Sequence, residues 1–526
     1  MRMKGGALLG LVLLGSVAGD AWAAPKGADA CADLVGFKDA RLRLQVTGAE
    51  RVPAAAPGTV RAQPYLPPIP VEVPAYCKVS GRIDDRTGAG GVRYGIGFEL
   101  ALPEDWNGRF LFQGGGGLNG SIAPPLGTTG AGDVPALARG FAVVSTDSGH
   151  KGEGFDASFM QDQRAALDFA HASVGTTAQA ALLLIGRYYG KAPHHSYMAG
   201  CSTGGRETMQ ATQRWPELFD GALVNAPAMR TGYSNLALAH ARTKFMQAAP
   251  KDAQGKPQLA RAFSAADRKL ILDGLLAQCD ALDGLADGVI ENVLGCRFDP
   301  AQLQCKAGKR EDCLAPAQVT ALAEAFKAPR DAAGAPLYVD YPYDTGIVFE
   351  GPGIPGFLPG DGPDILAAVM PKAEGFDVDA QARKVREDAV QTLTDTHTWT
   401  NLGTFLGRGG KVMYYHGVSD PWFSALDTLD YYRRASQANG EAAWADASRF
   451  YFVPGMGHCG GGSSRDHFDL LTPLVEWVEQ GQAPGRVVAR GAALQGERPL
   501  CPYPTHAHYL GGDAASADSF TCKAPE

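Results

Sequence analysis

The sequence predicts an α/β fold, in which a mostly parallel β-sheet carries helices on both faces and a large insertion divides the chain that builds it. Strand-like apolar runs alternate with segments of helical period before residue 229 and again after residue 398. Residues 229–398 carry four cysteines and show no such alternation. We therefore expect one core in two parts, residues 24–228 and 399–526, with a lid domain at residues 229–398 between them.

Each expected element has a local reason. The strand runs are short and almost continuously apolar, which is typical of strands buried inside a parallel sheet. The helical segments repeat apolar residues at helical spacing, and glycine or proline ends them. An insertion in such a sheet usually covers the carboxyl ends of the strands, where these folds place their sites. Strands are expected at residues 109–113, 141–147, 195–200, 221–227, 411–417 and 448–455, helices at 174–190, 205–216 and 466–481, and a proline-rich irregular stretch at 53–74.

The N-terminus predicts a secretory signal peptide over residues 1–23. Arg2 and Lys4 precede an apolar run that is too short to span a bilayer, and Ala21-Trp22-Ala23 fits a small-x-small cleavage site. We therefore expect a secreted or periplasmic protein. The net charge of −8 and the lack of a Lys/Arg-rich run disfavour nucleic acid as a partner, and no other segment predicts membrane insertion. The sequence carries no signal for the oligomeric state.

A candidate nucleophile lies in the sequence GCSTG, residues 200–204. This matches the G-x-S-x-G pattern, and Ser202 falls between an expected strand and an expected helix. That context supplies the sharp turn that exposes the serine Oγ at the edge of a sheet. The amide groups of the following helix would also point at the site. The alternative interpretation is an ordinary tight Gly-Ser turn.

A serine hydroxyl needs a base, and the base needs a group that orients it. In this architecture the order along the chain is serine, then aspartate or glutamate, then histidine. Asp420 and His458 each follow an expected strand directly, and they stand in the required order after Ser202. His416 and His467 are nearby alternatives, which we interpret as a packed histidine and the start of the last helix.

The ten cysteines form no C-x-x-C motif, which leaves zinc and thioredoxin-type chemistry without support. An even number behind a signal peptide predicts disulfides. Cys201 directly precedes Ser202 and Cys459 directly follows His458, so a bridge between them would hold the serine turn to the histidine loop. The alternative, Cys201 as a thiol nucleophile, is disfavoured by an oxidising compartment. Pairing of nearest neighbours then predicts Cys279–Cys296, Cys305–Cys313 and Cys501–Cys522, and leaves Cys31–Cys77.

Attack by such a serine on a carbonyl group would form a tetrahedral intermediate, whose oxyanion needs two N–H donors. The backbone N–H of Thr203 is the first candidate, because it follows the nucleophile. The second is expected from the glycine-rich sequence QGGGGLNG at residues 113–120, at Gly116 or Gly117. The alternatives are a mobile linker and a phosphate-binding loop. The Walker pattern is absent, so we expect no nucleotide and no organic cofactor.

The insertion contains a second group of functional residue types. Asp280, Asp283 and Asp287 concentrate carboxylates between Cys279 and Cys296. Calcium favours carboxylates and main-chain carbonyls in a tight loop, although the spacing is not that of an EF-hand. From the residues alone, a solvated acidic loop is an equally good interpretation.

The stretches GCSTGG, HGVSDPW and GMGHCGGG together resemble the tannase/feruloyl esterase family of α/β-hydrolases, over essentially the whole mature chain. The cysteines beside the serine and the histidine are that family's distinctive mark. The resemblance implies that Ser202 is the nucleophile, Asp420 the acid and His458 the base. It also implies a structural calcium in the lid, bound by the side chains of Asp280, Asp283 and Asp287 and the carbonyls of Leu285 and Val289.

The resemblance further implies the substrate class. Family members hydrolyse esters of aromatic acids: gallate, ferulate and chlorogenate esters, and mono(2-hydroxyethyl) terephthalate. The stretch SDPWF resembles the terephthalate-monoester hydrolases, in which an aromatic side chain at the position of Phe423 packs on the substrate ring. Those enzymes hold the free carboxylate with a lid arginine, and residues 341–362 contain no arginine.

We therefore expect a serine esterase that acts on small esters of aromatic acids. Two alternatives remain open at this point. The first is a lipase or peptidase with the same triad, and the second is a non-catalytic binding protein on the same fold.

Overall fold

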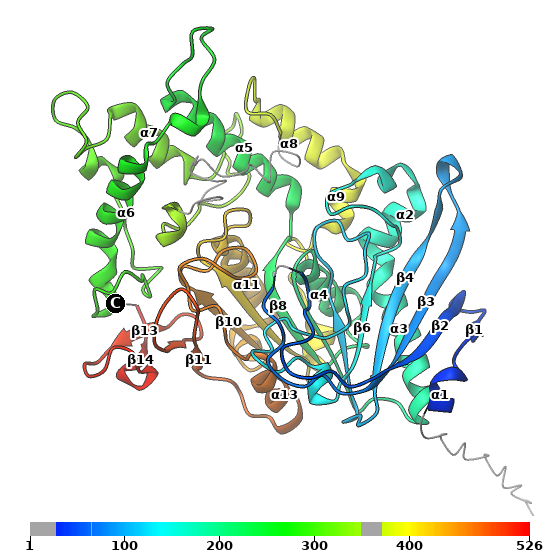
Figure 1. Cartoon of the computed structure of the whole chain (residues 1–526). Helices are drawn as coiled ribbons and strands as arrows, with labels where there is room; N and C mark the ends of the chain where they lie inside the picture. Colours follow the sequence, from blue (N-terminus) through cyan, green and yellow to red (C-terminus); the bar gives the residue numbers. More distant parts are fainter. Residues whose placement is uncertain (1–27, 65, 349–370, 526) are drawn as a thin grey trace, which may run out of the picture.

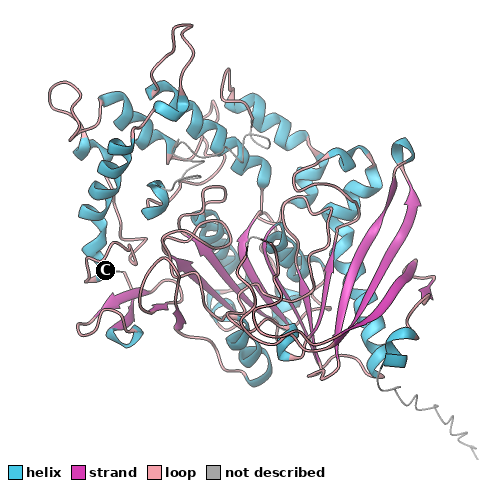
Figure 2. Cartoon of the chain, viewed as in Figure 1, coloured by secondary structure: helices cyan, strands magenta, loops and turns pink. Residues whose placement is uncertain are grey.

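The computed structural model describes residues 28–64, 66–348 and 371–525, and a ten-stranded sheet forms its centre (Figures 1 and 2). The predicted signal peptide, residues 1–23, lies outside the described residues. The strand order is β1-β2-β3-β4-β6-β5-β7-β8-β9-β10. The strands are β1 (Lys38–Asp39), β2 (Leu44–Val52), β3 (Tyr76–Thr87), β4 (Arg93–Pro103), β5 (Arg109–Gln113), β6 (Ala142–Thr146), β7 (His195–Ser202), β8 (Gly221–Pro227), β9 (Lys411–Gly417) and β10 (Ser448–Val453).

The sheet has a parallel part and an antiparallel part. Every pair among β5 to β10 is parallel, which confirms the expected α/β fold. Strands β1 to β4 form an antiparallel extension, which joins the parallel part through the pair β4–β6. The sequence analysis places no strands before residue 109. The alternating burial along β3 explains why a search for continuous apolar runs misses that strand.

Helices cover both faces of the parallel strands. On β5, Phe110 packs with residues of α3 (Ser173–Tyr189), whereas its neighbour Leu111 packs with Trp477 of α13 (Leu471–Gln480) on the opposite face. The stretch from α2 (Gln163–Leu167) through α3 is long and apolar enough to cross a membrane. However, 61% of its apolar window is buried inside the molecule, as in the core helix of a globular protein.

The last helix starts later than the sequence predicts. Helix α13 begins at Leu471 and not at residue 466. The Asp469 carboxylate accepts the N–H of Thr472 at 3.0 Å and so takes the place of a cap. His467 forms an isolated β-bridge with Arg490, and its ring lies 2.9 Å from Asp133. His467 is therefore not the start of the helix.

The insertion folds around a hydrophobic core of its own, which includes Phe245, Phe263, Leu275 and Ile290. Figure 1 shows its helices over the end of the sheet at which β8 and β10 finish. This is the position expected for a lid. Its helices are α5 (Thr231–Ala248), α6 (Ala265–Cys279), α7 (Pro316–Ala325), α8 (Val378–Glu387) and α9 (Ala389–Thr394).

The remaining elements complete the core and the C-terminal segment. The last part of the chain forms two small sheets that lie beside α6 (Figure 1). The helices are α1 (Ala28–Ala32), α4 (Thr203–Arg214), α10 (Gly403–Gly407), α11 (Ala425–Asn439) and α12 (Glu441–Ala445), and the strands are β11 (Val487–Ala489), β12 (Arg498–Leu500), β13 (His506–Tyr509) and β14 (Phe520–Lys523).

Five disulfides cross-link the described chain, and all ten cysteines take part. The pairs are the ones that the sequence predicts. They are Cys31–Cys77, Cys201–Cys459, Cys279–Cys296, Cys305–Cys313 and Cys501–Cys522.

Candidate active site

Ser202 lies at the junction of β7 and α4, with no intervening loop. Its backbone has φ 61° and ψ −123°, a region that residues with a side chain rarely adopt. The turn is this tight because glycines surround it. A Cβ on Gly200 would lie 2.5 Å from the carbonyl carbon of Gly204, and a Cβ on Gly204 would lie 2.6 Å from the oxygen of Gly115. Glycine at these positions therefore permits the strained turn that presents the serine side chain.

The expected acid and base come from the loops after β9 and β10. The Nδ1 atom of His458 lies 2.7 Å from Oδ2 of Asp420. Burial alone would raise the pKa of Asp420, but the contacts with His458 and His416 outweigh burial and hold that pKa well below its usual value. Asp420 is therefore ionised. The other ring nitrogen of His458, Nε2, is buried and has no partner among the described residues, so it is free to accept a proton.

The disulfide between Cys201 and Cys459 joins the residues directly beside Ser202 and His458. Their Cα atoms are 5.8 Å apart, although 258 residues separate them in the chain. The loops of the acid and the base also touch each other. A Cβ on Gly417 would lie 2.3 Å from the carbonyl oxygen of Met456, so the close approach of the two loops requires glycine there. These contacts bring the three expected residues into one site.

His416 has a supporting position under the acid. It is fully buried, with Nε2 3.2 Å from Oδ2 of Asp420 and 3.0 Å from the carbonyl oxygen of Phe423. Its Nδ1 atom lies 2.8 Å from Oγ1 of Thr428. The expectation of a packed histidine is confirmed, and the structure adds that His416 packs on the carboxylate of Asp420 itself.

The glycine-rich loop after β5 lies against the start of α4. The amide of Gly114 donates to the carbonyl of Ala199 at 2.9 Å, and the amide of Leu118 donates to the carbonyl of Gly154 at 3.0 Å. The amide of Gly115 donates to Oε2 of a glutamate of α4 at 2.8 Å. Within the described chain, the amides of Gly116 and Gly117 have no acceptor. Gly116 and Gly117 are the two candidates that the sequence predicts for the second oxyanion donor, beside the amide of Thr203.

The glutamate that holds this loop is Glu207, which sequence reasoning missed. Its side chain is fully buried on α4. In addition to the Gly115 amide, it accepts hydrogen bonds from Asn119 and Ser148, both at 3.0 Å. Thr203 binds the same loop through a hydrogen bond from its hydroxyl to the carbonyl of Gly117. The loop is therefore fixed to α4, the helix that follows Ser202, and is not a mobile linker.

Aromatic side chains surround the base. The rings of Trp422 and Phe423 are stacked 5.1 Å apart, and their centroids lie 5.9 Å and 5.3 Å from that of His458. Phe423 is only 3% exposed. By contrast, Phe155 is 42% exposed, and its ring lies 5.6 Å from Trp422. The aromatic surface exposed at this site therefore comes from Trp422 and Phe155, with Phe423 behind them.

A comparison with known protein families shows which family the chain is related to. The family described as tannase and feruloyl esterase matches residues 77–353 and 366–523. The chain belongs to the tannase and feruloyl esterase family. It is a hydrolase of that type, with the α/β-hydrolase fold of the family.

Individual relatives of the chain also carry the names of ester hydrolases. A mono(2-hydroxyethyl) terephthalate hydrolase from Piscinibacter sakaiensis is 37% identical, over 90% of this chain and 87% of that protein. A probable feruloyl esterase B-1 from Neosartorya fischeri is 29% identical, over 81% of this chain and 82% of that protein. The crystal structure of feruloyl esterase B from Aspergillus oryzae matches with a TM-score of 0.76 at 25% identity, over 94% of this chain and 100% of that chain.

The acidic loop of the esterase follows α6. The Asp280 carboxylate accepts the N–H of Asp287 at 3.2 Å, and Asp283 accepts those of Leu285 and Glu291, each at 3.0 Å. Burial raises the pKa of Asp283 to about 7, and the nearby Asp287 and Asp280 add to the rise. The three predicted carboxylates thus lie in one tight and partly buried loop.

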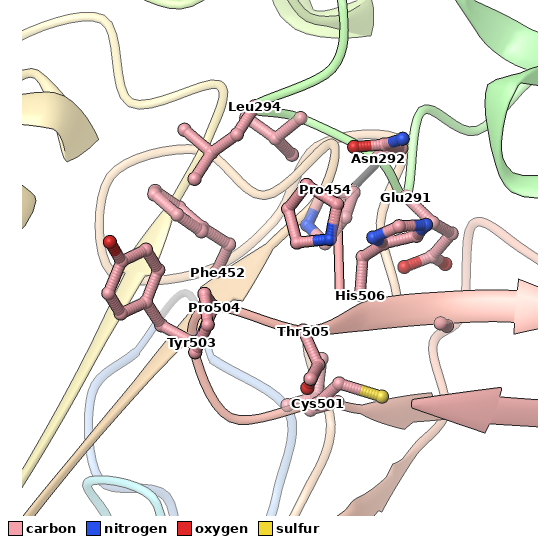
Figure 3. A pocket seen from close by; sticks show the side chains of 14 residues that line it. Glu291, Asn292, Leu294, Phe452, Pro454, Cys501, Tyr503, Pro504, Thr505 and His506 are labelled. Atoms are coloured by element: carbon pink, nitrogen blue, oxygen red, sulfur yellow. The ribbon is translucent and has the colours of Figure 1, made fainter. Parts of the chain in front are cut away.

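The C-terminal segment packs against this loop. The buried guanidinium of Arg498 binds the Asp287 carboxylate. Figure 3 shows a small cavity beside the loop, with Glu291 and His506 on one side and Leu294 and Phe452 on the other. Its volume of about 20 Å³ suits one water molecule and is too small for an ester substrate.

A different group of metal-ligating side chains lies at the opposite end of β7. The ligand atoms of His194, His195 and Glu479 lie within 4.8 Å of one another. However, the two oxygens of Glu479 accept hydrogen bonds from Arg109, both at 2.6 Å. We interpret this group as an ion pair. Sequence reasoning did not find it, because Glu479 is far from the histidines in the chain.

Proposed function

We propose that the protein is a secreted or periplasmic serine esterase that hydrolyses esters of aromatic acids. Ser202 would be the nucleophile, His458 the base and Asp420 the acid. The observation that carries the proposal is the 2.7 Å contact of Asp420 with His458, together with the disulfide between the residues beside Ser202 and His458. The five disulfides and the signal peptide that the sequence predicts support secretion.

The reaction follows from these positions. Ser202 Oγ attacks the ester carbonyl carbon while Nε2 of His458 takes the hydroxyl proton. The ionised Asp420 stabilises the imidazolium that forms. The imidazolium then gives its proton to the oxygen of the leaving alcohol, the C–O bond breaks, and an acyl-serine remains. Water repeats the sequence, with His458 again as the base, and the aromatic acid leaves.

The negative charge of the tetrahedral intermediate needs donors that are already in place. The amide of Thr203 and the free amides of Gly116 and Gly117 would supply them. Because Glu207 occupies the Gly115 amide, that amide is not available to the substrate. Removal of one such donor in other serine hydrolases costs about 10²–10³ in rate. The fixed position of the loop means that no reorganisation is needed during the reaction.

The aromatic acyl group would lie against Trp422 and Phe155. Relatives of this chain carry names that refer to feruloyl and terephthalate esters, and flat rings pack well on such a surface. A cavity of about 640 Å³ in the lid, lined in part by Asn235 and Lys384, lies close by. Asn235 also accepts the indole N–H of Trp422 at 2.8 Å. A cavity of this volume suits a small ligand.

We also propose a structural calcium ion in the acidic loop. The donor set of three carboxylates and two carbonyls is one that calcium prefers. The side chains of Asp280, Asp283 and Asp287 and the carbonyls of Leu285 and Val289 would hold it. The ion would neutralise carboxylates that burial destabilises, and so stiffen the base of the lid. Dialysis against a chelator should lower the melting temperature, and added calcium should restore it. Unchanged melting and no bound calcium in metal analysis would contradict the proposal.

A panel of esters tests the enzymatic proposal. Purified mature protein would be assayed beside Ser202→Ala on methyl gallate, methyl ferulate, chlorogenate, mono(2-hydroxyethyl) terephthalate and a long-chain nitrophenyl ester. We expect turnover of at least one aromatic ester, lost in the variant. Turnover of the long-chain ester alone would favour a lipase. Equal rates in both proteins would exclude catalysis by Ser202.

A further inference from the structure

One lid carboxylate contacts both loops that carry the acid and the base. Asp344 is 1% exposed and lies directly before the short helical turn Thr345–Val348. Its Oδ2 atom accepts two hydrogen bonds, from Oγ of Ser419 and from the amide of Gly455, both at 2.7 Å. Ser419 directly precedes Asp420, and Gly455 lies in the turn after β10 that leads to His458. A single oxygen thus joins the lid to both loops.

Ser419 is held from three directions. Its hydroxyl donates to Asp344 and accepts the N–H of Gly346 at 2.9 Å, and its own amide donates to the carbonyl of Met456 at 2.9 Å. The residue is fully buried. The residue before the catalytic acid therefore has no freedom to move without breaking contacts to the lid or to the base loop.

The lid holds the acid loop at further points. The hydroxyl of Tyr341 donates to the carbonyl of Trp422 at 2.9 Å. The hydroxyl of Ser424 donates to the carbonyl of Asp340 at 2.7 Å. Together with the bond from Ser419 to Asp344, these contacts hold the acid loop both before and after Asp420. The lid is therefore part of the frame that holds the acid, as well as a cover over the sheet.

Asp344 makes these contacts at an energetic cost. Its second oxygen, Oδ1, is buried without a partner among the described residues. Burial raises the pKa of its carboxyl, against the hydrogen bonds from Ser419 and Gly455. A buried and half-satisfied carboxylate destabilises a fold unless the bonds that it does make are needed. Those bonds lead to the acid and to the base.

We propose that Asp344 is a positioning residue, through which the lid fixes the distance and orientation between Asp420 and His458. The inference rests on the proposed function, because it assumes that these two residues are the acid and the base. It predicts that Asp344 contributes to catalysis without touching the substrate. A small displacement of catalytic groups can cost about 10²-fold in rate.

The test compares three variants on nitrophenyl acetate, whose hydrolysis needs the triad and not the aromatic site. Asp344→Ala removes both hydrogen bonds and should lower kcat about 10- to 100-fold with KM nearly unchanged. Asp344→Asn keeps an acceptor oxygen at the same place and should restore most of kcat. Ser419→Ala removes one of the two bonds and should have an intermediate effect.

Asp267→Ala is the matched control. Asp267 is also a buried lid carboxylate, but it caps α6 and binds Lys309, away from the triad loops. It should lower the melting temperature and leave kcat unchanged. The rate of Ser202 labelling by a fluorophosphonate should follow kcat in every variant. If the wild type does not label, the proposed function fails. If the wild type labels and Asp344→Ala matches it in kcat, or if Asp344→Asn is as impaired as Asp344→Ala, the positioning role is wrong.

Discussion

The two halves of the proposed catalytic centre are assembled in different ways. The nucleophile half is built from β7, α4 and the glycine-rich loop, in the first part of the core. Backbone-to-backbone contact holds it, because Gly200 and Gly204 leave no room for a side chain. The base half comes from loops that follow the lid in the chain. A disulfide that spans 258 residues and the contacts of Asp344 hold it instead.

This difference determines where each half is vulnerable. The turn at Ser202 depends on close backbone contacts of Gly200 and Gly204 with each other and with the glycine-rich loop, so only changes in or beside β7, α4 and that loop should disturb it. The proposed acid and base are held by groups that are distant in sequence. Substitutions in the lid should therefore change the positions of Asp420 and His458. Four predictions test this contrast, from the largest expected effect to the smallest.

The largest effect is expected at the acid itself. Asp420→Asn keeps the shape of the side chain but removes the charge that stabilises the imidazolium of His458. In other serine hydrolases the same change costs about 10⁴ in kcat. We expect a loss of that order with the fold retained, measured by steady-state kinetics and circular dichroism. A loss of only a few-fold would mean that another group orients the base.

The second prediction concerns the disulfide that joins the halves. Replacement of Cys201 and Cys459 by serine should lower kcat about 10- to 100-fold, because the base loop is no longer tied to the nucleophile turn. The matched control replaces Cys31 and Cys77 by serine. That pair lies far from the site, so its loss should cost stability, about 2–5 kcal/mol, and not kcat. Equal effects of the two double variants on kcat would remove the distinction between the halves.

The third prediction tests the nucleophile half. Glu207→Gln places an amide nitrogen against N–H or O–H donors on one side, so the glycine-rich loop should loosen. We expect kcat to fall about tenfold with little change in KM. Glu479→Gln is the control, since Glu479 binds Arg109 at the opposite end of the sheet. A Glu207→Gln enzyme with normal kcat would show that the loop holds its position without this carboxylate.

The smallest effect is expected at the aromatic surface. Trp422→Ala removes a ring contact worth about 0.5–1.5 kcal/mol, so kcat/KM for an aromatic ester should fall about tenfold or less. The rate on nitrophenyl acetate should change little. Trp399→Ala, which removes a 59% exposed tryptophan elsewhere, should affect neither substrate. An equal fall on both substrates would mean that Trp422 supports the acid loop and does not bind the ring.

Sequence reasoning succeeded where the signal is local. The strand at residues 221–227 is the observed β8, and the residues predicted for the nucleophile turn and its flanking strand and helix lie where expected. The pairing of Cys201 with Cys459 could also be predicted, because each cysteine lies beside a residue of a recognisable motif. Adjacent residues in a motif share a backbone geometry, which a pattern can predict.

Sequence reasoning failed where the structure depends on contacts between distant segments of the chain. Asp344 lies in a stretch without a motif, and only its bonds to Ser419 and Gly455 give it a role. Glu207 follows the nucleophile motif, but nothing in the sequence shows that it faces the Gly115 amide. The antiparallel strand β3 was missed for a different reason, since its alternating burial hides it from a search for apolar runs.

The central claim is that His458, held by Asp420, activates Ser202. The most direct test treats the protein with a fluorophosphonate, digests it, and maps the adduct by mass spectrometry in the wild type and in His458→Ala. The account predicts a single adduct on Ser202 in the wild type and a labelling rate lower by orders of magnitude in the variant. An adduct on a different residue, or labelling of Ser202 at the same rate without the histidine, would contradict it.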